Sequence, residues 1–300
     1  MRNELLSACK LCPRECGVDR NNSKTGFCGA DDRIKVARSA LHFWEEPCIS
    51  GDKGSGTVFF SHCTLKCVYC QNYSISTKNQ GKYVTENELS EMFLTLQNQG
   101  ALNINLVTPT HYVPQIIQAL KLAKEKGLTL PVLYNTSGYE KAETIELLRG
   151  YVDIFLPDFK YYDSAYSKKY SGAENYTQAV KEAIDKMFSM VGKCEFDEKG
   201  IIKKGVIVRH LMLPGLADDS KKILEYLYKT YSDDIYISIM SQYTPLETLP
   251  KEFPELKVPV DMTVYDKVLD FAVDLGIENA FVQDGESVSE SFIPEFWNEE

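Results

Sequence analysis

The chain has 300 residues, of which 44% are hydrophobic and 25% charged, an ordinary composition for a globular protein. Its formal net charge of −10 argues against a role in coating nucleic acids, because that role requires clustered Lys and Arg. No apolar segment approaches the roughly 18 residues of a membrane helix, and the first ten residues lack the apolar stretch of a signal peptide. We therefore expect a cytoplasmic protein with neither a nucleic acid nor a membrane as its partner.

Four cysteines lie close together near the start of the chain. Cys9, Cys12, Cys16 and Cys28 are separated by two, three and eleven residues, and three glycines among them allow tight turns. In a reducing cytosol, such short spacings favour a metal over disulfides. We predict a closed metal site, and both zinc and an auxiliary iron–sulfur cluster are compatible with four thiolates. Its expected role is structural or in relaying electrons.

Strand and helix patterns alternate from residue 56 onward. Short runs rich in β-branched residues are followed by segments whose apolar residues recur at helical spacing. The predicted strands span residues 56–61, 103–107, 130–135, 152–157, 205–213, 234–240 and 279–283. The predicted helices span residues 85–100, 113–127, 140–150, 176–192, 218–231 and 262–276. Thr85 and Glu88 have the spacing of a capping box at the start of the first of these helices.

This alternation predicts six strand–helix units, which form a parallel sheet with right-handed crossovers. Six units are too few for the complete eight-unit barrel, which typically needs about 250 residues. We predict an α/β fold, a partial (β/α)6 TIM-like barrel over residues 51–300, with a small cysteine-rich metal-binding segment over residues 1–50. Barrels of this type carry their chemistry at the carboxyl ends of the strands. The irregular segment 242–262 follows the sixth strand, so we expect a lid, a substrate surface or a stiff spacer there.

Three further cysteines follow the first predicted strand directly. Cys63, Cys67 and Cys70 lie within eight positions, and thiolates suit zinc or iron–sulfur clusters. A closed zinc site requires four ligands, whereas three thiols on a four-iron cluster leave one iron open to bind a substrate. We therefore expect an iron–sulfur site at the mouth of the barrel. Cys48 and Cys194 stand alone, and we expect them to be small buried hydrophobes.

The segment CTLKCVYCQN, residues 63–72, resembles the CxxxCxxC loop of the radical S-adenosylmethionine (SAM) enzymes, with the aromatic Tyr69 before the last cysteine. Other segments resemble the pyruvate formate-lyase activating enzyme-like branch, and they are CKLCPRECGVDR, NINLVTPTHYVPQI, LPDFKYYDSAYS, VIVRHLMLPG and SIMSQYTP. The resemblance implies a [4Fe–4S] cluster on Cys63, Cys67 and Cys70, with SAM as the second cofactor. One electron from the cluster would cleave SAM to methionine and a 5′-deoxyadenosyl radical, which abstracts hydrogen.

The resemblance also implies contacts to SAM from the first three strands. Tyr69 would lie near the adenine. The stretch VTPTH, with Thr108 and Thr110, stands where the family has Gly-Gly-Glu, so the contact to the methionine amino group changes. His111 would replace that contact, touch the substrate or be structural. In YNTSGY, Asn135 and Ser137 stand where the family has Asp-Thr-Asn-Gly.

Further contacts are implied at the later strands. Asp158 and Lys160 resemble the family's Asp-Leu-Lys and share one side of the chain by strand alternation. This aspartate helps to hold a monovalent cation beside the SAM carboxylate in the family, and an ordinary surface ion pair is the alternative. Arg209 would face inward to the SAM carboxylate or ribose, and His210 would pack under a helix. Met240 and Gln242 are candidates for the adenine surface, although Met240 also suits a core position.

We therefore predict a radical SAM oxidoreductase that abstracts hydrogen from a protein glycine, as glycyl-radical activating enzymes do. Its partners would be a flavodoxin- or ferredoxin-type reductant and a glycyl-radical enzyme. A small molecule or a peptide is the alternative substrate. A non-catalytic, metal-stabilised interaction module is the alternative of another class, and it would require a fourth ligand such as His62 beside the three thiols.

Overall fold

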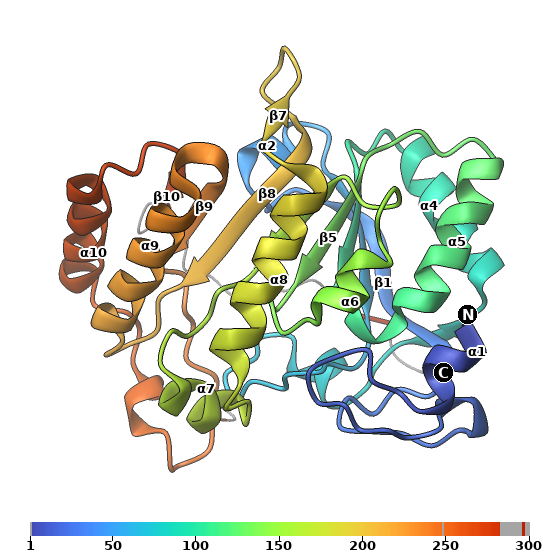
Figure 1. Cartoon of the computed structure of the whole chain (residues 1–300), viewed down its shortest axis with the longest axis horizontal. Helices are drawn as coiled ribbons and strands as arrows, with labels where there is room; N and C mark the ends of the chain where they lie inside the picture. Colours follow the sequence, from blue (N-terminus) through green and yellow to red (C-terminus); the bar gives the residue numbers. More distant parts are fainter. Residues whose placement is uncertain (1, 248, 283–295, 298–300) are drawn as a thin grey trace.

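The sheet is built mainly from parallel strands, as the alternating pattern predicts. The computed structural model describes residues 2–247, 249–282 and 296–297 (Figure 1). Within these residues, seven neighbouring strands run parallel in the order β10-β9-β8-β6-β5-β4-β2. They are β2 (Ser55–Phe60), β4 (Ile104–Val107), β5 (Val132–Thr136), β6 (Ile154–Pro157), β8 (Ile202–Leu211), β9 (Tyr236–Met240) and β10 (Ala280–Val282). The sheet curves without closing, so the predicted partial barrel is confirmed.

One edge of the sheet comes from residues that the sequence patterns left outside the barrel. β1 (Ile34–His42) pairs antiparallel with β2, and β3 (Lys82–Val84) pairs antiparallel with β1. The sequence of β1 mixes charged and apolar residues, because its second half is only half-buried. β1 lies on the N-terminal side of the domain boundary that we predict at residue 50. That domain boundary stays a prediction.

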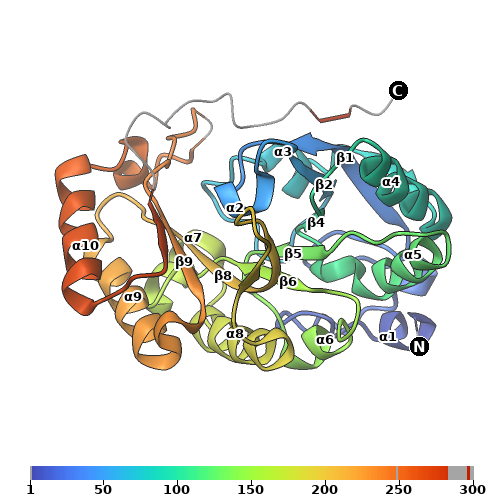
Figure 2. The same ribbon diagram turned by 90° about the horizontal axis from the view of Figure 1, so that it is seen from above.

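Helices cover the outer face of the curved sheet (Figure 2). The six predicted helices are present as α4 (Glu86–Asn98), α5 (Val113–Glu125), α6 (Ala142–Glu146), α8 (Tyr176–Val191), α9 (Ala217–Tyr231) and α10 (Met262–Leu275). Four short helices were not predicted, and they are α1 (Arg2–Ser7), α2 (Pro47–Ser50), α3 (Tyr73–Ser76) and α7 (Ser164–Ser171). Among the described residues, no helix is both long and apolar enough to cross a bilayer.

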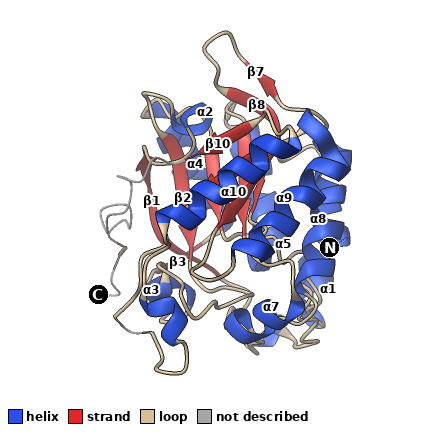
Figure 3. Cartoon of the chain, turned by 90° about the vertical axis from the view of Figure 1, so that its left-hand side faces the viewer, coloured by secondary structure: helices blue, strands red, loops and turns tan. Residues whose placement is uncertain are grey.

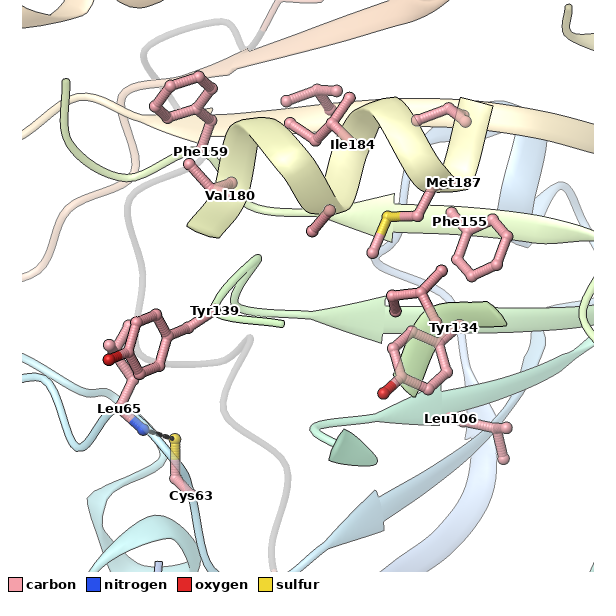
Figure 4. Packing of buried hydrophobic residues seen from close by; sticks show 14 of the residues in the cluster. Cys63, Leu65, Leu106, Tyr134, Tyr139, Phe155, Phe159, Val180, Ile184 and Met187 are labelled. Carbon is pink, nitrogen blue, oxygen red and sulfur yellow. Dashed lines mark hydrogen bonds between the residues drawn. The ribbon is translucent and has the colours of Figure 1, made fainter. Parts of the chain in front are cut away.

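Local sequence explains where the helices begin and which face they bury. Thr85 and Glu88 form the predicted capping box at the start of α4, with each side chain bonded to the backbone of the other residue. Apolar residues three and four apart on α8 face the sheet, so that Met187 lies beside Phe155 of β6 in the main core (Figure 4). The strands at the centre are buried on both faces, as parallel strands under helices are.

The two ends of the sheet carry different elements. α3, α7 and the cysteine-rich segment before β1 lie at the carboxyl ends of the parallel strands (Figures 1 and 3). The short hairpin formed by β7 (Glu195–Phe196) and the start of β8 lies at the opposite end together with α2. The fold therefore gathers the loop after β2, the strand ends and the N-terminal cysteines at one end.

Candidate active site

A cavity of about 540 Å3 lies inside the curved sheet. Its wall includes the three thiols of the loop after β2 and polar residues at the ends of later strands. Of the residues predicted to contact SAM, those that line it are Tyr69, Thr108, Asn135, Ser137, Asp158, Lys160, Arg209, Met240 and Gln242. The sheet thus brings together side chains from six parallel strands or the loops that follow them. Their roles as SAM contacts stay predictions.

The loop that carries Cys63, Cys67 and Cys70 surrounds its sulfurs with hydrogen-bond donors. The backbone N–H of Leu65 donates to Cys63 Sγ over 3.3 Å, as Figure 4 shows. The Ser171 hydroxyl of α7 donates to Cys67 Sγ over 3.0 Å. The Ser76 hydroxyl of α3 donates to Cys70 Sγ over 3.5 Å. Each of the three thiols therefore has its own donor: one from the loop itself, one from the adjacent α3, and one from α7, which is distant in the chain.

These donors and the burial of the thiols suit metal ligands. Burial raises the pKa of the Cys63 thiol to about 12, so without a bound cation this group carries its proton at neutral pH. A metal centre would hold the thiols as thiolates, for which the surrounding donors are suited. In the described part of the chain, no three Cys, His, Asp or Glu side chains are arranged to share a single metal ion. A four-iron cluster spreads its thiolates over separate irons, so this donor set fits a cluster.

Tyr69 belongs to a chain of hydroxyl groups that ends on a thiol. Its hydroxyl lies 2.7 Å from that of Tyr161, which lies 2.8 Å from the hydroxyl of Ser171. Ser171 in turn contacts Cys67. Tyr69 is buried, and its ring lies edge-on to that of Tyr243 at 6.1 Å. The hydroxyl end of Tyr69 is therefore fixed by the protein, while the side chain still lines the cavity.

Asp158 and Lys160 form an ion pair in the cavity wall. Lys160 Nζ lies 2.6 Å from Asp158 Oδ2, and both side chains are largely shielded from solvent. Burial would lower the pKa of Lys160, but the charge and hydrogen bond of Asp158, together with the nearby Cys67 and Cys70, outweigh burial and raise this pKa above its usual value. The predicted alternative of an ordinary surface pair does not describe this partly enclosed pair, although its role toward SAM stays a prediction.

Tyr176 of α8 holds the loops after β5 and β6 together, a role that sequence reasoning missed. Its hydroxyl accepts from the backbone N–H of Lys160 over 2.9 Å and lies 2.9 Å from the carbonyl oxygens of Ser137 and Asp158. At Gly138, a Cβ would lie 2.2 Å from the Asp158 carbonyl oxygen, and φ is +76°. Only glycine fits at this close approach, which explains the glycine in YNTSGY.

Arg209 faces into the cavity as predicted, but protein carboxylates already surround its guanidinium. Its Nε donates to Glu46 Oε1 over 2.7 Å, and its Nη2 bonds both Glu46 and Glu45. These two glutamates follow β1, in the segment that the sequence patterns left outside the barrel. Burial would raise the pKa of Glu46, but Arg209 outweighs it and holds that pKa below its usual value. The partner of Arg209 in the structure is therefore a carboxylate pair, and the predicted contact to SAM stays a prediction.

Thr110 lies outside the cavity wall, unlike the other predicted SAM contacts. Its buried hydroxyl donates to Glu140 Oε1 over 2.6 Å, and Thr136 and Tyr134 donate to the same oxygen. Burial raises the pKa of Glu140 to about 7. Thr108 takes the place at the end of β4 that faces the cavity, with a positive φ of 59°.

The histidines and the isolated cysteines are mostly in structural positions. His210 accepts or donates to Ser220 of α9 at 2.8 Å, so its predicted packing under a helix agrees with the structure. His111 is buried, and its Nε2 lies 2.8 Å from the Ser61 carbonyl oxygen. His62 is absent from the described wall of the cavity and lies against Gly29. Cys48 is buried in a small core cluster of apolar residues that is separate from the main core, and Cys194 packs against this cluster.

The four N-terminal cysteines surround a second, small cavity. Cys9, Cys12, Cys16 and Cys28 line a space of about 20 Å3, which His111 also borders. The four cysteines thus lie around one space, as their predicted role as one site requires. Their binding of a metal stays a prediction.

Comparisons with known proteins place the chain in a family. The model of the Radical SAM superfamily matches residues 57–227, more than half of the chain. The chain belongs to this superfamily. It is therefore an enzyme of the radical SAM class, and membership implies a [4Fe–4S] cluster and SAM, which the three thiols in the cavity fit.

Relatives of the chain cover different parts of it. It is 29% identical over 280 residues to an uncharacterized protein of Methanocaldococcus jannaschii, across 89% of this chain and 75% of that protein. It is 28% identical over 175 residues to the pyruvate formate-lyase-activating enzyme of Clostridium pasteurianum, across 55% of this chain and 65% of that enzyme. The structure of Streptococcus suis SuiB bound to the precursor peptide SuiA has a TM-score of 0.50 at 13% identity. That match covers 74% of this chain and 46% of SuiB, and it supports the fold alone.

Proposed function

We propose that this enzyme cleaves SAM reductively at a [4Fe–4S] cluster bound by Cys63, Cys67 and Cys70, and abstracts hydrogen from a substrate. The observation that carries the proposal is the cavity itself, in which the three thiols face the ends of five further strands. When bound, the cluster and SAM supply the electron transfer and the 5′-deoxyadenosyl radical that the reaction needs. The residues of the chain bind SAM and the substrate, orient them and exclude water from the cavity.

The cavity wall offers groups for each part of SAM. Lys160 is a cation at the carboxyl end of β6, suited to a carboxylate. Met240 and Gln242 follow β9 and provide a polarizable and a hydrogen-bonding surface for adenine. Carbonyl and hydroxyl groups in the loops after β4 and β5 take the place of the family's acidic residue, which contacts the amino group of SAM. Glu45 and Glu46 place two carboxylates against the single guanidinium of Arg209 in the cavity wall, an arrangement that suits a further cationic group.

We further propose that the hydrogen comes from a glycine residue of a partner protein. The match to the pyruvate formate-lyase-activating enzyme supports this substrate. The cavity of about 540 Å3 must also receive SAM, so the room that remains suits a short protein segment and equally a small molecule. A flavodoxin- or ferredoxin-type protein would supply the electron.

The first test asks whether SAM is cleaved. The protein is reconstituted anaerobically with iron and sulfide, reduced and mixed with SAM, and 5′-deoxyadenosine is measured by chromatography. We expect product from the wild type and from Cys48→Ala, a control that changes a cysteine in a separate small core cluster. The variant C63A/C67A/C70A should give none. Equal product from that variant, or none from a wild type that carries a reduced cluster with a candidate substrate, would contradict the proposal.

The second test asks where the hydrogen comes from. A candidate glycyl-radical enzyme is labelled with deuterated glycine and added to the reduced enzyme and SAM. We expect deuterium in 5′-deoxyadenosine and an organic radical signal in the electron paramagnetic resonance (EPR) spectrum of the partner. Cleavage of SAM without deuterium transfer from any candidate protein would favour a small molecule or a peptide as the substrate.

A further inference from the structure

The four N-terminal cysteines are brought to one point by tight turns. Cys9 and Val18 pair through the backbone, and the Glu15 N–H closes a turn onto the Cys12 carbonyl oxygen over 3.0 Å. A second turn joins Gly29 to Gly26. At Gly26, a Cβ would lie 2.8 Å from Cys16 Sγ, so any larger residue would displace that sulfur. The backbone of this segment is therefore shaped around its thiols, although it contains no long helix or strand of its own.

A buried cation faces these thiols. Arg20 is only 1% exposed, and its Nη1 lies 3.7 Å from Cys9 Sγ. Its remaining hydrogen bonds go to the backbone carbonyl oxygens of Asp31 and His111, and no carboxylate pairs with it among the described residues. A buried charge is costly unless an anion compensates it. Arg20 therefore indicates that negative charge resides on the cysteine group.

Free thiols would not provide that charge. A cysteine thiol has an ordinary pKa of about 8.5, so it is uncharged at neutral pH unless a cation binds it. Bound to a metal centre, the four groups become thiolates and the whole site is anionic. The backbone N–H of Phe27 already donates to Cys16 Sγ over 3.3 Å. A thiolate-bound metal centre thus accounts for the buried arginine beside the cysteine group.

The space between the thiols favours a cluster over zinc. Zinc holds four sulfurs at about 2.3 Å, which places them about 3.8 Å apart and leaves no free volume between them. Here the four cysteines share the lining of a space of about 20 Å3 with Leu11, Val18, Arg20, Gly26 and His111, and in the described part of the chain no three Cys, His, Asp or Glu side chains are arranged around a single metal ion. An iron–sulfur cluster binds its thiolates at separate irons, so it does not require the four sulfurs to meet around one ion. We propose that Cys9, Cys12, Cys16 and Cys28 bind a second iron–sulfur cluster, with every iron held by the protein.

This second cluster would lie against the loop of the first. Arg14, between Cys12 and Cys16, donates from Nε to the Thr64 carbonyl oxygen over 3.1 Å. Its Nη2 donates to the Ser171 carbonyl oxygen over 2.9 Å. Thr64 lies within the CxxxCxxC loop, and Ser171 donates to Cys67. Through Arg14, the cysteine-rich segment therefore positions both the loop of the first site and the donor to one of its thiols.

The test removes the first site and asks whether a cluster remains. The experiment does not require cleavage of SAM, so its result does not depend on the proposed function. Full-length C63A/C67A/C70A is reconstituted anaerobically, and iron, sulfide, zinc, visible absorption and the EPR spectrum of the reduced protein are measured. We expect iron and sulfide in equal amounts, at least two of each per chain. Zinc without sulfide, or no bound metal, would overturn the proposal.

Two further variants guard against a folding artefact. In the full-length wild-type background, C12A/C16A should lose the second set of iron and sulfide and keep the first. The matched control C48A/C194A changes two cysteines that lie apart from both groups and should keep both sets. Circular dichroism checks that each variant is folded. A folded C12A/C16A protein with the iron and sulfide content of the wild type would overturn the assignment.

Discussion

The hydroxyl of Ser171, at the end of α7, donates a hydrogen bond to Cys67 Sγ, although 104 residues separate them. A donor of this kind stabilises the more negative, reduced state of a cluster bound to that thiolate, and so raises its reduction potential. The reduction potential decides whether a given electron donor can reduce the cluster. A serine outside the cysteine motif therefore takes part in setting the chemistry of the first site.

Replacing Ser171 by Ala should lower the reduction potential of the first cluster. A hydrogen bond worth about 0.5–1.5 kcal/mol corresponds to roughly 20–60 mV for one electron. The measurement is an EPR-monitored redox titration of the reconstituted protein. Ser167→Ala is the control, because the hydroxyl of this buried serine of the same helix donates to the Ser164 carbonyl oxygen and not to a thiol. Identical potentials for all three proteins would show that the contact has no electronic effect.

Replacing Arg209 by Leu should destabilise the fold strongly. The change leaves Glu45 and Glu46 buried without their cation, and breaking a buried pair in this way costs about 3–5 kcal/mol. Urea unfolding of the protein without cofactors measures the loss. Adding Glu45→Gln and Glu46→Gln to the same chain should recover much of it. If Arg209→Leu keeps full stability and loses only SAM binding, the arginine acts as a ligand and not as the partner of the glutamates.

Lys160→Met should weaken SAM binding. Loss of one charge-assisted hydrogen bond, worth about 1.5–3 kcal/mol, raises the dissociation constant about 10- to 100-fold. Calorimetric titration of the reconstituted protein with SAM gives this constant. Lys169→Met is the control, because this exposed lysine pairs with Glu255 and does not line the cavity. Unchanged affinity would mean that Lys160 serves only to pair with Asp158.

The contribution of Glu140 to stability should fall between about pH 4.5 and pH 7, while the buried histidines His62, His111 and His210, whose pKa values burial lowers, act in the opposite direction. Burial raises the pKa of the Glu140 carboxyl group to about 7 from a normal value of 4.5, so the folded state retains a proton that the unfolded state has lost. At this site the unfolded state binds fewer protons, and the contribution of Glu140 to the free energy of unfolding decreases as pH rises through this range. The total contribution is on the order of 3 kcal/mol.

Glu140→Gln should remove this dependence. Urea unfolding at several pH values between 5 and 8 gives the difference in stability between variant and wild type. That difference should shift in favour of the variant as pH rises, whatever its value at pH 5. Glu143→Gln, an exposed change on α6, controls for the loss of one negative charge. Parallel pH curves for wild type and Glu140→Gln would mean that the buried carboxyl does not titrate in this range.

The barrel could be predicted from the sequence because its signals are local. Apolar spacing located all six helices, and the capping box of Thr85 and Glu88 fixed the start of α4 to the residue. Strand alternation placed Asp158 and Lys160 on one side of the chain, and the family resemblance indicated that Arg209 faces inward; all three line the cavity. β1 was missed, because a half-buried strand beside the edge of a sheet carries no continuous apolar run.

The parts of the site that could not be predicted depend on contacts between distant segments. Nothing near Arg209 in the sequence indicates that Glu45 and Glu46, more than 160 residues earlier, enclose its side chain. Ser171 and Tyr176 likewise reach the site from helices whose sequences show only ordinary helical patterns. Thr110 was expected to contact SAM from its place in the motif. The turn after β4 instead points its hydroxyl at Glu140, which only the folded backbone reveals.

The contacts of Arg14 have a consequence for how the protein is made. Its Nη1 bonds the carbonyl oxygen of Gly172, 158 residues later in the chain. At about 5–20 residues per second, a ribosome needs roughly 8–30 s to extend the chain over that distance. During this time Cys12 and Cys16 have been synthesised, but the carbonyl groups that hold Arg14 between them have not. The cysteine-rich segment can therefore reach its final position against α7 only after residue 172 has been added to the chain.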